Sequence, residues 1–441
     1  MNNFRSVLYK IFLFDIGGTF QDVILSYVIG QNKFESQDLL IQKRCRKNKM
    51  VEYIIPFAVA LIVSFFASPI AKKIAVRCNA IDVPKDDRRM HKKPTALMGG
   101  LAVIAGFLVS VFYVFLVYRP DDLLAWAKDI SPVKMIGFFA ALVIVIAMGV
   151  IDDIHPLSAK VKFPIQLVAA AIVVFTGTKI KYFTISIKDI KYVSIDDVLS
   201  TVLSILWIVG ITNAINLIDG LDGLAAGVTG IASLSLFVVA VMMVPDIPAV
   251  FAVLYVALAG AIMGFLPYNF NPAKIFIGST GAYFLGFMMS VISIEGATKA
   301  YTALTMVVSL IALGLPIFDT AFAIIRRVLN KKPIGEGDRG HIHHRLVDMG
   351  ISPKFSVTIL YVVTGALGLV SILLANKGLL PAIILVVIIS VFVVAGARYL
   401  SGIIGDKQEE MMNGVSHEDD SVKKKASDNA RTYTHGQAEK P

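Results

Sequence analysis

The chain has 441 residues, of which 56% are hydrophobic and 17% charged, with a formal net charge of +10. A soluble domain carries roughly 25% charged residues, so this composition excludes an ordinary soluble globular protein. Many apolar runs approach the roughly 20 residues that a helix needs to cross a bilayer, which predicts an all-α polytopic membrane protein. Positive charge is typical of the cytoplasmic loops of such proteins, so it does not call for a nucleic-acid partner.

The N-terminal segment 1–49 differs from the rest of the chain. Its apolar part carries Lys10, Asp15 and Asp22, which disfavour a membrane span, and its end is strongly basic. We expect it to lie outside the core fold, with translation starting at Met50. The membrane core is predicted over residues 50–401. The polar, mixed-charge segment 402–441 is predicted to be a disordered cytoplasmic tail.

Hydropathy predicts about eleven transmembrane helices in this core. They are expected at 51–71, 97–118, 134–150, 163–178, 198–215, 224–244, 248–267, 281–295, 302–325, 356–376 and 379–399. The connection 179–197 alternates apolar and polar residues, which is typical of a small β-hairpin.

The distribution of Lys and Arg gives these spans an orientation. Both loops richest in basic residues follow odd-numbered spans, the first and the ninth, and the positive-inside rule makes that side cytoplasmic. The hairpin then lies in an outer loop. Every segment that suggests chemistry also follows an odd-numbered span: 91–100, 151–163, 212–225, 268–281 and 335–346. The sequence therefore predicts one site on the cytoplasmic face.

The segment 212–225 holds the most informative pattern. Asn213, Asn216, Asp219 and Asp222 recur every third residue, which places them on roughly one face of a helical turn. An acid at the end of a membrane span is costly unless it meets water, a cation or a partner. The pattern favours a ligand site over a polar turn.

A second pair of acids ends the third predicted span. Asp152 and Asp153 are adjacent, and neighbouring carboxylates push their pKa values apart, which suits one acid to orient a bound group and the other to accept a proton. Lys160 and Lys162 follow, and they could neutralise phosphate charge. A capping or solvated pair is the structural alternative.

A histidine cluster lies near the end of the core. His341, His343 and His344 are flanked by Arg339 and Arg345, and such groups fit as donors to a pyrophosphate or sugar. A zinc site and a solvated basic loop stay open as alternatives. Together with the Asn and Asp oxygens, which suit Mg²⁺, these motifs suggest phosphoryl transfer to a lipid substrate.

Four motifs carry a resemblance to a known family. GVIDDIHPLSAKVKF, NAINLIDGLDGLA, NFNPAKIF and GHIHHRL resemble the polyprenyl-phosphate N-acetylhexosamine-1-phosphate transferases of glycosyltransferase family 4, over about Met50 to Leu400. The resemblance is nearest to the enzymes that start teichoic-acid or O-antigen synthesis. It implies attack by undecaprenyl phosphate on the β-phosphorus of UDP-GlcNAc, with release of UMP, at the cytoplasmic face of the cell membrane. It also implies Mg²⁺ or Mn²⁺, and a homodimer stays open.

The resemblance assigns roles to the residues that match its motifs. Asp152 and Asp153 match the catalytic acids, and Asn216 matches the metal-binding asparagine. The predicted substrate-binding residues are Asn213, Asp219, Asp222, Lys160, Lys162, Arg339, His341, His343 and His344.

One position departs from the family pattern. The family usually reads G-D-x-G where this chain has Gly278-Ser279-Thr280-Gly281, so a metal-binding carboxylate is replaced by a hydroxyl. Losing a charged contact in a partly dehydrated site costs on the order of 2–5 kcal/mol. Three readings follow: an impaired or inactive transferase, a site rescued by Asp219 or Asp222, or an error in the sequence.

Rival functions stay open at this point. A different donor, such as UDP-GalNAc or a bacillosamine derivative, would use the same chemistry. A transporter or channel is a rival of another class, since intramembrane acids also mark ion paths. The acids here gather at one boundary and no internal repeat is visible, which disfavours that rival. A non-catalytic scaffold is the third alternative, because of Ser279.

Overall fold

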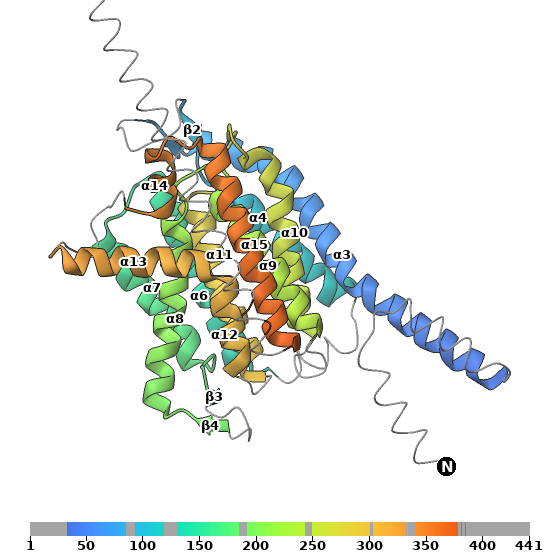
Figure 1. Cartoon of the computed structure of the whole chain (residues 1–441). Helices are drawn as coiled ribbons and strands as arrows, with labels where there is room; N and C mark the ends of the chain where they lie inside the picture. The colour runs from blue at the N-terminus through green and yellow to red at the C-terminus, as the bar shows by residue number, and fades with distance from the viewer. Residues whose placement is uncertain are drawn as a thin grey trace, which may run out of the picture. The chain divides into compact units, whose positions relative to one another are not determined.

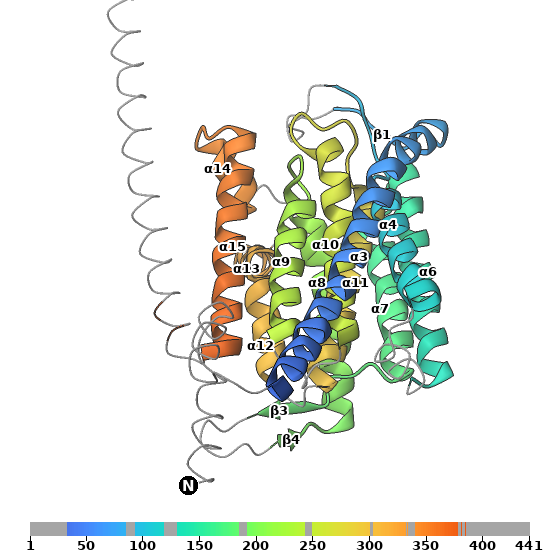
Figure 2. The ribbon, with the colours of Figure 1, turned by 90° about the vertical axis from the view of Figure 1, so that its right-hand side faces the viewer.

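The computed structural model describes residues 33–84, 93–118, 130–184, 192–242, 249–299, 303–331, 333, 340–377, 381 and 384. The chain divides into two compact units, Met1–Ile54 and Ile55–Pro441. The architecture that follows is that of the second unit, in which long helices pack side by side as a bundle (Figures 1 and 2).

Helices account for nearly all of the regular structure. They are α3 (Lys33–Arg77), α4 (Gly100–Tyr113), the π-helical η1 (Val114–Tyr118), α6 (Pro132–Ile154), α7 (Ala159–Phe175), α8 (Asp197–Leu217), α9 (Leu224–Met242), α10 (Ala249–Asn269), α11 (Gly278–Lys299), α12 (Ala303–Ala312), α13 (Gly314–Leu329), α14 (Ile342–Asp348) and α15 (Pro353–Lys377). In the described part of the chain, seven are long and apolar enough to cross a membrane, and the count is eight if the bent pair α12–α13 is taken as one span. The all-α polytopic class is confirmed. The predicted span 379–399 lies almost wholly outside the described residues, so the count of eleven stays a prediction.

The centre of the bundle is α11. Its residues 281–294 are all buried, as expected for a helix that is apolar on every side. It packs against α4, α6 and α8. Two polar contacts fix its C-terminal part: the indole Nε1 of Trp207 donates to Ser293 Oγ at 3.0 Å, and Lys134 Nζ pairs with Glu295 at 2.7 Å.

Glycines let α3 approach its neighbours closely. A Cβ on Gly106 of α4 would lie 2.6 Å from the carbonyl oxygen of Ala60, and Gly260 and Gly264 of α10 face the backbone of α3 in the same way. Small residues at helix contacts are typical of membrane bundles, where dispersion contacts between helices replace the hydrophobic effect. The position of α3 against α4 and α10 is therefore set by backbone contact.

The predicted hairpin in 179–197 is present. Strands β3 (Tyr182–Thr184) and β4 (Tyr192–Ser194) pair antiparallel, with Phe183 opposite Val193. They lie at the opposite end of the bundle from α14 (Figures 1 and 2). A second antiparallel pair, β1 (Ile81–Asp82) with β2 (Thr95–Ala96), follows α3 and was not predicted.

The predicted span 302–325 is broken rather than straight. Helices α12 and α13 meet at an angle of 79° across Leu313, so α13 crosses the bundle and is seen end-on in Figure 2. Gly314 and Pro316 open α13. Proline has no N–H to continue the hydrogen bonds of α12 but is well tolerated in a first turn, which explains a break at this point.

Candidate active site

Segments far apart in the sequence meet at one end of the bundle, the end that carries α14. They are the C-terminal end of α6, the turn between α8 and α9, the connection from α10 to α11, and α14 itself. Direct contacts join them: Asp153 with Ser279, Asp222 with Asn271, and Gly220 with His343. The described part of the segment 91–100 also joins them, because Gly99 and Gly100 donate to the carbonyls of Phe276 and Ile277. All five segments that were predicted to share one face thus contribute to one cluster.

Asp153 sits at the N-terminus of α11. Its Oδ1 accepts from the backbone N–H of Ser279 at 2.7 Å, and its Oδ2 accepts from the N–H and the hydroxyl of Thr280 at 3.1 and 2.6 Å. The helix dipole also favours a negative charge here. Gly278 has φ +70°, and a Cβ at that position would lie 2.6 Å from Asp153 Oδ2. The chain therefore holds this carboxylate in one orientation.

Asp152 has a different environment, although it is the next residue and equally buried. Its Oδ2 pairs with Lys162 Nζ at 2.7 Å, and its Oδ1 accepts from the N–H of Leu157 at 2.8 Å. The ion pair joins the end of α6 to the first turn of α7. Lys162 is thus neutralised by Asp152, whereas Lys160 is exposed.

The turn between α8 and α9 is anchored on both sides. Asp222 Oδ2 accepts from Asn271 Nδ2 at 3.0 Å and from the N–H of Ala273 at 2.9 Å. The hydroxyl of Tyr361 in α15 donates to the carbonyl of Gly223 at 2.6 Å. Asp222 therefore ties this turn to the α10–α11 connection.

Asp219 is the acid of this turn that the chain leaves least satisfied. Its side chain makes no hydrogen bond with any described residue. Burial, together with the negative charges of Asp153 and Asp222, raises the pKa of Asp219 to about 8. Three carboxylates thus lie close enough to repel one another, an arrangement that a bound cation would relieve.

His343 faces the same turn. Its side chain is 1% exposed, and a Cβ on Gly220 would collide with its Nε2. Burial and the neighbouring His344 lower the pKa of His343 to about 3, so the ring is neutral at physiological pH. Neither ring nitrogen has a hydrogen-bond partner among the described residues. A neutral imidazole suits a hydrogen bond to a ligand better than the pairing of a charge.

The bent helix α13 orients the histidine motif through a residue that sequence reasoning missed. Asp319 is buried, and it accepts from the N–H of Ile342 and contacts His341 Nδ1, both at 2.8 Å. Arg326 donates to the carbonyl of Gly340 at 3.0 Å. An acid inside the apolar run 302–325 was the signal that could have identified Asp319.

The remaining predicted residues lie at varying distances from this cluster. Asn216 is in the last turn of α8, and its carbonyl accepts from the N–H of Asp219 at 3.3 Å. Asn213 lies one turn earlier, where its amide donates to Gln166 of α7 and to the carbonyl of Val209. These contacts give Asn213 a place between two helices, and its role in substrate binding stays a prediction. Arg339 lies outside the described residues.

The donor set bears on the expected metal. Among the described residues, no three His, Cys, Asp or Glu side chains form a ready-made metal site. Mg²⁺ needs only one or two carboxylates, because it keeps several waters and binds substrate phosphates. The carboxylates of Asp153 and Asp219 and the amide of Asn216 are of the oxygen type that this ion prefers. The residues present fit such a cation.

Comparisons with known proteins identify the family. Residues 135–297 match the family model of glycosyl transferase family 4. The chain is 38% identical over 363 residues, 81% of this chain and 95% of the relative, to a Bacillus subtilis protein named "probable undecaprenyl-phosphate N-acetylglucosaminyl 1-phosphate transferase". It is 32% identical over 353 residues, 76% of this chain and 86% of the relative, to the decaprenyl-phosphate N-acetylglucosaminephosphotransferase of Mycolicibacterium smegmatis. The chain therefore belongs to the polyprenyl-phosphate N-acetylhexosamine-1-phosphate transferases of glycosyl transferase family 4 and is a multi-pass membrane phosphoglycosyl transferase.

Proposed function

We propose that this chain transfers GlcNAc-1-phosphate from UDP-GlcNAc to undecaprenyl phosphate, releases UMP, and thereby initiates a cell-surface glycan such as teichoic acid. One observation carries the proposal: acids from α6 and the α8–α9 turn converge with the histidines of α14 at one end of a membrane bundle. The names of the relatives support the donor sugar and a polyprenyl-phosphate acceptor. The basic end of α3 supports a cytoplasmic site at the cell membrane.

In this proposal Asp153 acts on the acceptor. Its carboxylate, held by the N-terminus of α11, positions or deprotonates the phosphate of undecaprenyl phosphate. An oxygen of that phosphate attacks the β-phosphorus of UDP-GlcNAc, the bond from that phosphorus to the bridging oxygen breaks, and UMP leaves. Because the attacking and leaving groups are both anionic, most of the catalysis would come from positioning and charge stabilisation.

The other predicted residues act on the donor. Asp219 and Asp222 line the nucleotide and pyrophosphate site, with Lys160 available to balance charge. In the proposal the neutral ring of His343 hydrogen-bonds the sugar-nucleotide, and His341, whose Nδ1 contacts Asp319, binds it through Nε2. Mg²⁺ or Mn²⁺, held by Asn216 with carboxylates of the cluster, would neutralise charge on the transferring phosphoryl group.

Ser279 supports a second candidate, the same fold with impaired turnover. Its backbone N–H donates a hydrogen bond to Asp153, but its side chain offers a neutral oxygen where the family usually has a carboxylate. The cation would then be held with one negative charge fewer, and weaker binding or slower transfer would follow.

The decisive experiment measures UMP release by the purified full-length protein with UDP-GlcNAc and undecaprenyl phosphate, with and without Mg²⁺. Cation-dependent release supports the proposal, and UDP-GalNAc in parallel tests the choice of donor. Release only by the Ser279→Asp form supports the impaired candidate. No release by either form, with ion flux in liposomes, would refute the transferase in favour of a transporter.

A further inference from the structure

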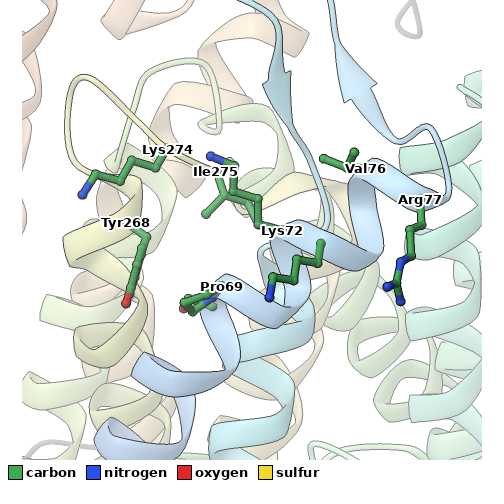
Figure 3. Close-up of a pocket in the computed structure, with 9 residues that line it drawn as sticks. Pro69, Lys72, Val76, Arg77, Tyr268, Lys274 and Ile275 are labelled. Atoms are coloured by element: carbon green, nitrogen blue, oxygen red, sulfur yellow. The ribbon is translucent and has the colours of Figure 1, made fainter.

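A groove of about 520 Å³ lies outside the candidate active site (Figure 3). One wall is the C-terminal part of α3, which contributes Lys72, Lys73 and Arg77. The other wall is the end of α10 and the connection to α11, with Tyr268 and Lys274. Apart from Arg339, which lies outside the described residues, none of the predicted catalytic, metal-binding or substrate-binding residues lines it.

The groove is strongly basic. The lining residues that the structure describes include four cations, Lys72, Lys73, Arg77 and Lys274, and no carboxylate. All four side chains are exposed, so they are available to a ligand in the bilayer interface. Basic pockets between membrane helices on the cytoplasmic side suit anionic lipid headgroups. The charge of the groove therefore selects for a phosphate-bearing ligand.

The surface of α3 next to the groove changes from apolar to basic along the helix. Phe66, Ile70, Lys73 and Arg77 follow one another at spacings of four, three and four residues, which places them on one stripe of the helix. Phe66 is 67% exposed and Ile70 58% exposed. Acyl chains would lie along the apolar half of this stripe and a headgroup along the basic half.

We propose that the groove binds the phosphate headgroup of an anionic phospholipid of the bilayer and that this lipid joins α3 to the α10–α11 connection. Lysine and arginine side chains from both walls contact the headgroup, while the acyl chains follow α3 into the membrane. Binding of the phospholipid does not depend on the proposed function of the protein. Its effect on catalysis does rest on that proposed function.

The connection that forms one wall also holds the candidate site. Tyr268 and Lys274 belong to the same short segment as Asn271 and Ala273, which bind Asp222. The carbonyl of Tyr268 accepts from the N–H of Lys274 at 2.8 Å, so the segment folds back on itself. A headgroup bound to Lys274 therefore restrains the segment that positions Asp222.

The occupant is a bilayer phospholipid rather than the acceptor lipid. Between Ile275, which lines the groove, and Ser279, which binds Asp153, the chain pairs with the segment 96–100. Phe276 donates to Ala96 at 2.9 Å, Gly99 donates to Phe276 at 2.9 Å, and Gly100 donates to Ile277 at 2.8 Å. These backbone hydrogen bonds fix Phe276 and Ile277, the residues that follow the groove residue Ile275 and precede the segment that binds Asp153.

The first test measures lipid binding by the full-length protein in nanodiscs. Native mass spectrometry compares retention of phosphatidylglycerol with retention of phosphatidylcholine, for the wild type and for the Lys73→Gln/Lys274→Gln variant. We expect the preference for phosphatidylglycerol to fall roughly thirtyfold, since each lysine near the surface is worth about 1 kcal/mol. Lys331→Gln/Lys354→Gln removes the same charge from exposed lysines outside the groove and should keep the preference. An equal loss in both variants, or no preference in the wild type, would overturn the proposal.

The second test measures UMP release in the same nanodiscs. We expect phosphatidylglycerol to activate the wild type and the control variant but not the groove variant. If the acceptor lipid occupied the groove instead, the groove variant would show a raised KM for undecaprenyl phosphate in pure phosphatidylcholine, which contradicts the proposal. Selective lipid binding without UMP release in any form would contradict the proposed function and leave the lipid site standing.

Discussion

The acids at the end of the bundle differ in how well the chain satisfies them, and Asp219 stands apart from the other three. Asp152 and Asp153 accept hydrogen bonds or an ion pair on every carboxylate oxygen. Asp222 also accepts two hydrogen bonds, whereas Asp219, in the same turn, is partly buried and has no hydrogen-bond partner among the described residues. A satisfied acid fixes the local structure, whereas an unsatisfied one retains the capacity to bind a ligand. Asp219 is therefore the acid of this cluster with the most remaining capacity to bind a ligand.

The largest expected effect comes from removing the charge of Asp153. Asp153→Asn keeps the shape but turns an NH₂ group or a neutral oxygen toward Ser279 and Thr280, and removes the group proposed to act on the lipid phosphate. We expect UMP release to fall about 10²–10⁴-fold.

The matched variant is Asp152→Asn, which still accepts from Leu157 and loses only the pair with Lys162. A smaller loss than for Asp153→Asn is expected. Equal losses, or no loss at Asp153, would contradict the division of roles between these neighbours.

The next largest expected effect is a gain in activity, from the substitution Ser279→Asp. Ser279→Asp places a carboxylate at the N-terminus of α11, beside Asp153, and is expected to strengthen cation binding. We expect Mg²⁺-dependent UMP release to rise, by up to about a thousandfold if 4 kcal/mol of transition-state stabilisation is regained.

Titration of activity against Mg²⁺ concentration checks the cause, since Ser279→Asp should saturate at lower concentrations. Equal activity of the two forms would show that a carboxylate at this position is dispensable.

The contact between the α8–α9 turn and the histidine motif gives a smaller effect. Gly220→Ala places a methyl group against Nε2 of His343 and displaces the ring, and a misplacement of about 1 Å can cost about a hundredfold in rate. The kcat/KM for the sugar nucleotide measures the loss.

Gly210→Ala in α8 is the control, because a Cβ there meets nothing within 4 Å. It should leave activity intact and stabilise the helix by roughly 0.5–1 kcal/mol. Wild-type kinetics in Gly220→Ala would show that His343 does not depend on this contact.

The smallest effect concerns pH and stability. Asp219 has its pKa raised to about 8 in the folded protein from 3.8, so the folded state holds a proton that the unfolded state has lost between these values. Asp219 therefore lowers stability progressively as pH rises from about 4 to 8. In cation-free buffer, Asp219→Asn should raise the Tm at pH 8 by about 2–4 °C for each kcal/mol relieved.

At pH 5 the difference between wild type and Asp219→Asn should be much smaller, because the wild-type carboxyl is protonated in the folded state. Thermal unfolding at the two pH values measures it. If the Tm of Asp219→Asn exceeded that of the wild type equally at both pH values, charge repulsion would not be the cause of the difference.

Sequence patterns predicted the helical class, the seven helices long and apolar enough to cross a membrane, the β-hairpin and the gathering of polar motifs at one end. Hydropathy and the alternation of polar and apolar residues depend only on neighbours along the chain, and transfer into a bilayer depends on the composition of each segment. These features can therefore be predicted from short stretches of sequence. The predicted helical turn through Asn213, Asn216, Asp219 and Asp222 was wrong in its second half, because α8 ends at Leu217 and both acids lie in the turn that follows.

Only the tertiary structure decided which groups meet. The hydrogen bond from the hydroxyl of Thr280 to Asp153 joins residues 127 positions apart. The contact of Asp319 with His341 depends on the bend at Leu313. Such contacts follow from how helices pack, and no local pattern encodes the direction of a side chain across a bundle. The sequence determined that this is a membrane protein with its polar motifs on one side. The packing decided which acids are satisfied by the protein and which are left for a ligand.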